Sequence, residues 1–193
     1  MSDANNIPAS GIKETNNLFP VFLKLEQLSL LMIGGGSIAK EKLDAVLGNA
    51  PATKVKLVAT EILPEIKELT ALYPNFSIQE RSYLLDDFDG TDLVIAAVND
   101  LELAAKIQQD AHYKGRLINI ADKPELCDFY LGSVVKKGQL KIAISTNGKS
   151  PTIAKRLRET FEDMIPDQMD ELLENMGKIR DRLGGDFNHK VKV

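Results

Sequence analysis

The sequence predicts an α/β protein with a doubly wound parallel sheet, and three features carry this prediction. Apolar runs alternate with segments of helical periodicity between residues 28 and 120. The run Leu28–Ile33 is mostly apolar, as in a parallel strand that helices cover on both faces. It leads directly into Gly34, Gly35 and Gly36, and a helical segment follows them.

Each element of this first part follows from its periodicity and from the residues that end it. Phe19–Leu25 alternates apolar and polar positions, which predicts a half-buried strand before the glycines. Pro74 ends the helix predicted at 63–73, and Asn99 or Asp100 can cap the helix predicted at 101–113. The predicted strands are Phe19–Leu25, Leu28–Ile33, Lys54–Ala59, Phe76–Arg81, Leu93–Val98 and Leu117–Ile120, and the predicted helices are Ser37–Leu47, Leu63–Tyr73 and Leu101–Tyr113.

The pattern changes after residue 125. Phe129–Val135 and Leu140–Ser145 predict a strand pair, and because two strands alone are marginally stable, a second subunit is the simplest partner. Ser150 and Pro151 begin a helix that ends before Pro166, and an amphipathic helix follows over Asp167–Leu183. We expect a disordered tail at 1–17, a nucleotide-binding domain at 18–125, dimerisation strands at 126–150, a helical segment at 151–185 and a tail at 186–193.

The glycine turn matches the dinucleotide fingerprint of Rossmann-type folds. Gly34-x-Gly36-x-x-Ala39 is its Gly-x-Gly-x-x-Ala form. Gly34 permits the tight turn, Gly36 lets the backbone approach a pyrophosphate, and Ala39 lets the helix pack closely on the strand. The alternative is a glycine turn that only permits tight packing.

Three further strand ends should meet at the same edge of the sheet. Thr60 and Glu61 follow one strand, where an acidic residue binds ribose hydroxyls; with no Arg nearby, NAD is favoured over NADP. Ala97 and Asn99 end the next strand and could lie against the nicotinamide ribose. Asp122 follows the last strand, where partial burial would make it a usable general base. The alternative for Asp122 is a turn residue before a proline.

Charge and loop chemistry point to an anionic ligand in the second part of the chain. The net charge is −4, yet Ser133–Arg158 contains no Asp or Glu and seven basic residues. A basic segment on an acidic protein favours a specific anion over nucleic acid, although it could be only a solvated face. The hydroxyls, glycine and lysine of Ser145, Thr146, Gly148, Lys149 and Ser150 could form an anion cradle, or simply begin a helix.

Composition excludes several classes of protein and of metal site. Hydrophobic residues make up 44% and charged residues 27% of the 193 residues, as in ordinary globular proteins. No apolar run approaches the ~20 residues of a membrane span, and we expect the polar segment at 1–17 to be neither a signal peptide nor an anchor. A single cysteine, Cys127, excludes an internal disulfide and a cysteine-based metal site, and it fits a cytoplasmic protein.

Taken in order, these residues resemble a known family. Phe19–Phe22, the Ile-Gly-Gly-Gly turn with Lys40–Lys42, Ala96-Ala97, Asn119–Asp122 and Ser145–Glu159 are similar to the precorrin-2 dehydrogenase/sirohydrochlorin ferrochelatase family. This family forms the module fused to a methyltransferase in multifunctional siroheme synthase. The resemblance covers about residues 17 to 183.

The resemblance implies NAD-dependent oxidation of precorrin-2 to sirohydrochlorin, with ferrous iron insertion in bifunctional members. It implies a homodimer, Asp122 as the essential aspartate, and Ser37, Ile38, Thr60 and Glu61 as cofactor contacts. The substrate would be a polycarboxylate tetrapyrrole, for which Asn119, Lys136, Lys149 and Arg156 are candidate contacts. No metal-ligand set is expected.

Two departures and two alternatives accompany this interpretation. No methyltransferase sequence follows, so we expect uroporphyrinogen methylation on another protein. Thr146 stands where one form of the family has a serine that can be phosphorylated. The alternatives are an NAD-sensing regulatory domain, which would need no base, and a generic NAD-dependent reductase of a small anionic substrate, which would have a compact pocket.

Overall fold

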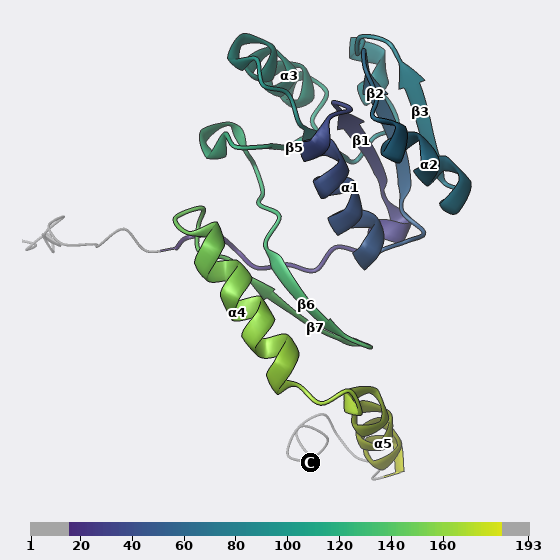
Figure 1. The fold of residues 1–193 in the computed structure, drawn as a ribbon, viewed down its shortest axis with the longest axis vertical. Coiled ribbons are helices and arrows are strands. Elements are labelled where there is room, and N and C mark those ends of the chain that lie inside the picture. Colours follow the sequence, from purple (N-terminus) through teal and green to yellow (C-terminus); the bar gives the residue numbers. More distant parts are fainter. Residues whose placement is uncertain (1–15, 183–193) are drawn as a thin grey trace, which may run out of the picture.

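Five parallel strands form the central sheet of the computed structural model, which describes residues 16–182. The strand order is β3-β2-β1-β4-β5, so the chain winds outward in both directions from β1 (Figure 1). The strands are β1 (Ser29–Ile33), β2 (Lys54–Ala59), β3 (Phe76–Glu80), β4 (Leu93–Ala96) and β5 (Leu117–Ile120). The predicted doubly wound parallel sheet is confirmed.

Helices cover both faces of this sheet. Alternate residues of β1 separate the two layers: Met32 packs with the helices α1 (Ser37–Asn49) and α2 (Pro64–Leu72), and Leu31 packs with α3 (Leu101–Tyr113). Leu31 and Met32 are completely buried, as expected for a strand covered on both sides. The glycine turn therefore follows a strand that is packed between two layers of helices.

The register aligns the carboxyl ends of the inner strands. Ile33 at the end of β1 lies beside Val58 of β2 and Ala96 of β4, and Ala96 lies beside Ile120 of β5. The segments that follow these strands therefore emerge at one edge. Ligands of open α/β sheets bind at that edge.

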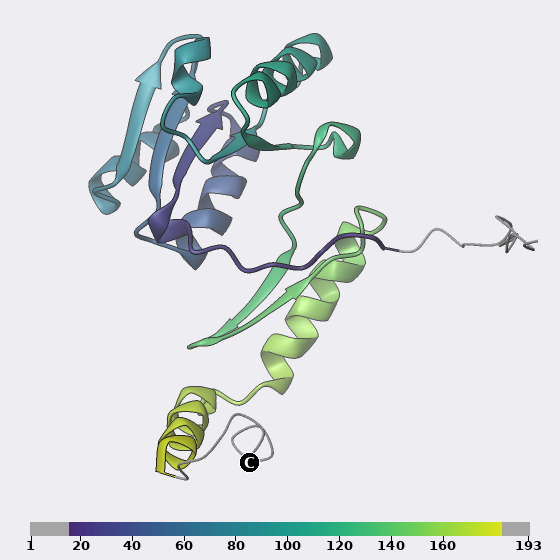
Figure 2. The ribbon, with the colours of Figure 1, turned by 180° about the vertical axis from the view of Figure 1, so that it is seen from behind.

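A smaller unit follows the sheet (Figure 2). It contains the antiparallel pair β6 (Ser133–Lys137) and β7 (Leu140–Ile144), the helix α4 (Pro151–Met164), which packs on β6, and the helix α5 (Met169–Arg182). The pair is shorter than predicted because residues 129–132 connect the two units instead of pairing with a strand.

Two lysines of the strand pair contact the unit that contains the parallel sheet. Lys136 Nζ donates to the carbonyl of Gly48 at 3.0 Å, and Lys141 Nζ donates to that of Asn49 at 2.9 Å. These carbonyls lie at the carboxyl end of α1, where unpaired acceptors and the negative end of the helix dipole favour cations. Part of the basic segment therefore joins the two units.

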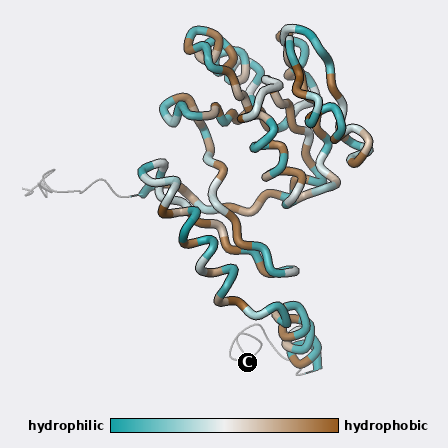
Figure 3. The backbone as a smooth tube through the Cα atoms, viewed as in Figure 1, coloured by the Kyte–Doolittle hydropathy of each residue, from teal (hydrophilic) through white to brown (hydrophobic). Residues whose placement is uncertain are grey.

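The small unit buries little apolar surface within one chain. In its described elements only Val135 and Ala154 are buried, whereas Ile153 of α4 and Leu172 of α5 are each 54% exposed. Figure 3 shows hydrophobic positions along these helices. The unit therefore presents apolar side chains to its surroundings.

The predicted strand Phe19–Leu25 is wrong. Residues 16–24 are extended but pair with no described strand, and a short 3₁₀ turn, Leu25–Gln27, leads into β1 (Figure 1). Phe19 is 86% exposed and Phe22 69% exposed, because nothing in the described chain covers them. The predicted tails lie outside the described residues apart from 16 and 17, and none of the described helices is long and apolar enough to cross a membrane.

Candidate cofactor and substrate site

The glycine turn holds the end of β1 against its neighbours. Gly34 has a φ of +118°, which L side chains rarely adopt, and a Cβ there would collide with the carbonyl oxygen of Ala97. A Cβ on Gly35 would collide with the carbonyl oxygen of Glu61. The tight turn predicted at Gly34 is confirmed. The close approach at Gly35 was not predicted, although three successive glycines were its signal.

The amino end of α1 suits a phosphate group. Gly36 is the N-cap, no side chain caps the helix, and the first turn carries no acidic residue. A Cβ on Gly36 would meet nothing within 4 Å, so there is room for a ligand beside the backbone. Ala39 is fully buried, as its packing role requires. The helix N–H groups and its positive dipole end therefore fit a pyrophosphate.

The other predicted cofactor residues lie around this turn. Ser37 and Ile38 are the first residues of α1. Exposed Thr60 and Glu61 directly follow β2 at the same edge. Ala97 follows β4 and its N–H donates to Ile33 at 2.8 Å, and Asn99 lies exposed before α3. These residues follow the carboxyl ends of β1, β2 and β4, the edge at which open α/β sheets bind dinucleotides.

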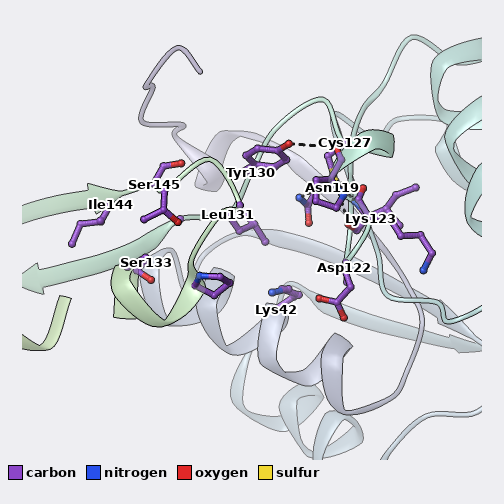
Figure 4. Close-up of a pocket in the computed structure, with 18 residues that line it drawn as sticks. Lys42, Asn119, Asp122, Lys123, Cys127, Tyr130, Leu131, Ser133, Ile144 and Ser145 are labelled. Atoms are coloured by element: carbon purple, nitrogen blue, oxygen red, sulfur yellow. Dashed lines mark hydrogen bonds between the residues drawn. The ribbon is translucent and has the colours of Figure 1, made fainter. Parts of the chain in front are cut away.

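Asp122 lies where the carboxyl edge meets the small unit. It follows β5, adopts a left-handed φ of 60°, and lines a cavity of about 390 Å³ (Figure 4). The expected partial burial of Asp122 is not found, because the cavity leaves this side chain exposed within one chain. A carboxylate at this position can accept a proton from a ligand in the cavity.

The cavity is formed between the two units rather than by the sheet alone. Of the predicted substrate contacts, Asn119, Ser145 and Thr146 line it. Sequence reasoning missed Lys42, Lys123 and Tyr130, which line it too. Lys42 had a signal, since it lies three residues after buried Ala39 and so near the inner side of α1. Its side chain is 24% exposed and pairs with Glu41 at 3.1 Å.

The loop before α4 uses its hydroxyls on its own backbone. Ser150 Oγ accepts from Ile153 N–H at 3.2 Å and caps α4, and Thr146 Oγ1 lies 3.1 Å from Ser150 O. Asn147 adopts a left-handed φ of 53°. The helix-start interpretation of Ser150 is therefore observed, and neither Lys149 nor Ser150 lines the cavity.

Two predicted basic contacts lie elsewhere. Lys136 does not line the cavity, because its ammonium group binds the end of α1. Arg156 is exposed on α4, also outside the cavity lining. Within residues 16–182, no group of three His, Cys, Asp or Glu side chains could hold a metal ion.

A parallel sheet with this turn defines a nucleotide-binding α/β protein. Comparison with family models gives the particular family. Residues 21–133 match the model described as putative NAD(P)-binding, and residues 137–164 match the model described as sirohaem biosynthesis protein central. The chain belongs to the putative NAD(P)-binding family.

Curated relatives include siroheme synthases. The chain is 35% identical over 166 residues to the siroheme synthase of Zymomonas mobilis, covering 85% of this chain and 34% of that protein. It is 34% identical over 183 residues to that of Psychrobacter cryohalolentis, covering 92% and 32%. The chain thus spans about a third of the length of the curated relatives it matches.

A solved structure shares the fold. SirC, precorrin-2 dehydrogenase, superposes with a TM-score of 0.71 at 24% sequence identity, covering 91% of this chain and 86% of that one. The agreement extends over both units, so the small unit is part of the shared architecture.

Proposed function

We propose that the protein oxidises precorrin-2 to sirohydrochlorin with NAD as the acceptor, and that Asp122 is the general base. One observation carries the proposal. Asp122 lines a cavity at the carboxyl edge of the sheet, and the Gly34–Gly36 turn lies at the same edge. The names of the siroheme synthase relatives and of SirC supply the substrate class. The single cysteine supports a cytoplasmic location.

Different residues of the chain would bind the cofactor and accept the proton from the substrate. The α1 amino end binds the pyrophosphate, and Thr60 and Glu61 bind the adenosine ribose. Bound NAD would supply the acceptor for the hydride that leaves the substrate. Asp122 accepts the proton that leaves with it, so the substrate loses two electrons and two protons in balance.

Substrate carboxylates would be bound mainly from the nucleotide-binding unit. Lys42 and Lys123 bring positive charge to the lining of the cavity that contains Asp122. Lys123 Nζ also donates to the Val98 carbonyl at 3.1 Å, and Lys42 Nζ pairs with Glu41 at 3.1 Å, so each ammonium group keeps further donors for a substrate carboxylate. Asn119, Ser145 and Thr146 complete the polar lining, whereas Lys136, Lys149, Ser150 and Arg156 would act only from outside it.

Ferrous iron insertion is a second proposed activity of the same cavity. Iron would be a substrate here, and Asp122 could accept the protons of the pyrrole N–H groups that iron displaces. No resident metal site is needed for this reaction.

A second copy of the chain is the proposed partner of the small unit. The exposed apolar side chains of residues 18–24, α4 and α5 support a homodimer, as does the marginal stability of an isolated strand pair. The proposed units are residues 18–125, 126–150 and 151–185. Sedimentation of wild type and of the double variant Phe19→Ser/Phe22→Ser tests the homodimer. We expect wild type to be a dimer and the double variant to shift toward monomer. A monomeric wild type would refute the homodimer.

An anaerobic absorbance time course tests the proposed function. Precorrin-2 with the protein should give the sirohydrochlorin spectrum only when NAD is present, and ferrous iron should then cause a second change faster than the uncatalysed one. An NAD-binding protein with no NAD-dependent change would favour the regulatory-domain alternative. Turnover of other small anionic substrates alone would favour the generic reductase.

A further inference from the structure

The backbone at Asp122 needs support from its surroundings. Its φ of 60° places a non-glycine residue in the left-handed region, which is unfavourable for most side chains. Asp tolerates this conformation better than most residues, yet an exposed turn of this kind could adopt others. Whatever holds the turn also determines where the carboxylate lies in the cavity.

The thiol of Cys127 lies across the base of this turn. Its Sγ accepts from Ile120 N–H at 3.1 Å. It also lies 3.2 Å from the carbonyl oxygen of Ile120 and 3.3 Å from that of Lys123, so its single proton can be donated to either. One sulfur atom therefore joins the residues immediately before and after Ala121-Asp122.

Neighbouring contacts fix the thiol itself. Cys127 N–H donates to Pro124 O at 3.1 Å, and Asn119 Nδ2 lies 3.5 Å from Sγ while donating to Phe129 O at 2.8 Å. Lys123 N–H closes the turn on Ile120 O at 3.3 Å. The segment from β5 to Phe129 is thus a closed network in which Cys127 is the side chain that contacts both sides of Asp122.

The chemistry of this thiol suits holding rather than reacting. Burial raises the pKa of Cys127 above its ordinary value, so at neutral pH it keeps its proton and serves as both donor and acceptor. Alanine at this position would remove the contacts that Sγ makes with Asn119, Ile120 and Lys123 and would leave the backbone hydrogen bonds of the turn in place. Serine would keep a donor and an acceptor. Because the Cβ–Oγ bond of serine is shorter than the Cβ–Sγ bond of cysteine, its hydrogen bonds to Ile120 and Lys123 would be longer.

We propose that Cys127 is a positioning residue for Asp122, whose thiol holds the turn that presents the carboxylate to the substrate. This inference rests on the proposed function, because it assigns the thiol a role only if Asp122 acts as the base. Cys127 also lines the cavity, and its proposed role is to act through Asp122 rather than to exchange a proton with the substrate.

The test compares Cys127→Ala with Cys127→Ser in anaerobic turnover of precorrin-2. We expect the alanine variant to lose about 10- to 100-fold in kcat, as a small misplacement of a catalytic group does, with KM and the NAD dissociation constant within twofold of wild type. Serine should restore most of kcat. In an Asp122→Asn background, Cys127→Ala should lower the residual rate no further.

A second readout does not depend on the substrate. Amide hydrogen exchange at Ile120 should accelerate in Cys127→Ala and stay slow in Cys127→Ser, with unchanged exchange in the α1 core. Wild-type kcat in Cys127→Ala, or an equal further loss in the Asp122→Asn background, would overturn the positioning role. If wild type does not turn over precorrin-2, the proposed function fails, and unchanged Ile120 exchange would separately refute the structural part.

Discussion

Gly34 and Ala97 lie so close that no side chain fits between the glycine and the Ala97 carbonyl oxygen. This approach joins the ends of β1 and β4, the two strands over which the dinucleotide would lie. Gly34→Ala should therefore impair both folding and NAD binding, since the φ of +118° is also unfavourable for alanine. Thermal unfolding should show a loss of about 1–3 kcal/mol in stability. An unchanged melting temperature would contradict this geometry.

Gly36→Ala separates binding from folding. A Cβ at Gly36 meets no protein atom within 4 Å, so we expect an unchanged melting temperature but at least about tenfold weaker NAD binding by calorimetry, because the methyl group would occupy the place of the pyrophosphate. Gly48→Ala is the matched control on the same helix, with equally open space. It should keep NAD affinity and gain about 0.5–1 kcal/mol in stability. Equal NAD affinity in all three proteins would place the phosphates elsewhere.

Lys42→Met tests the proposed carboxylate contact. Because the Lys42 side chain lines the cavity beside the cofactor edge, its loss should raise KM for precorrin-2 about 10-fold while NAD affinity stays unchanged. Lys42→Arg should retain most of the affinity. Lys40→Met is the control, since Lys40 lies on the same helix and also pairs with an acidic residue, Asp44 at 2.6 Å, but does not line the cavity. If both methionine variants raise KM equally, the effect reflects overall charge rather than a contact.

Asp87 should make stability depend on acid pH. The Asp87 carboxylate is buried, binds Arg81 through two contacts at 2.7 and 2.8 Å, and lies 3.0 Å from Lys56 Nζ. The hydrogen bonds from Arg81 hold the pKa of Asp87 well below its usual range. The folded state therefore binds this proton less readily than the unfolded state, so the stabilisation is complete above about pH 4 and is lost as pH falls further.

Asp87→Asn checks this assignment. Urea unfolding at neutral pH should show a loss of about 3 kcal/mol, because two cations lose their buried partner. Between neutral pH and about pH 3, the variant's unfolding free energy should fall less steeply than that of wild type. Parallel pH profiles would assign the acid sensitivity to other carboxylates.

Local patterns in the sequence predicted the sheet and the turn because their causes are local. The apolar run before Gly34 has the composition of a strand buried on both faces, and buried Ala39 follows from helix–strand packing. Asp122 could be placed at the correct edge for the same reason, since parallel strands align their carboxyl ends. Its left-handed backbone and the thiol that holds it depend on contacts that no pattern specifies.

The failures concern contacts between distant parts of the chain. The alternation in Phe19–Leu25 indicated a strand, but a strand needs a partner, and the described chain provides none. Lys136 was expected to contact a substrate on charge alone, whereas the carboxyl end of α1, far away in sequence, binds it. Lys42 enters the cavity only because the small unit folds back toward α1.

Asp122→Asn tests most directly whether Asp122 is the general base. Asparagine tolerates the left-handed backbone and keeps the size of the side chain, but it cannot serve as the base. The measurement is the initial anaerobic rate of NAD-dependent sirohydrochlorin formation, with NAD affinity measured on the same samples. We expect the rate to fall at least about 100-fold while the NAD dissociation constant stays within twofold of wild type. A variant that binds NAD normally and oxidises precorrin-2 at the wild-type rate would contradict the account.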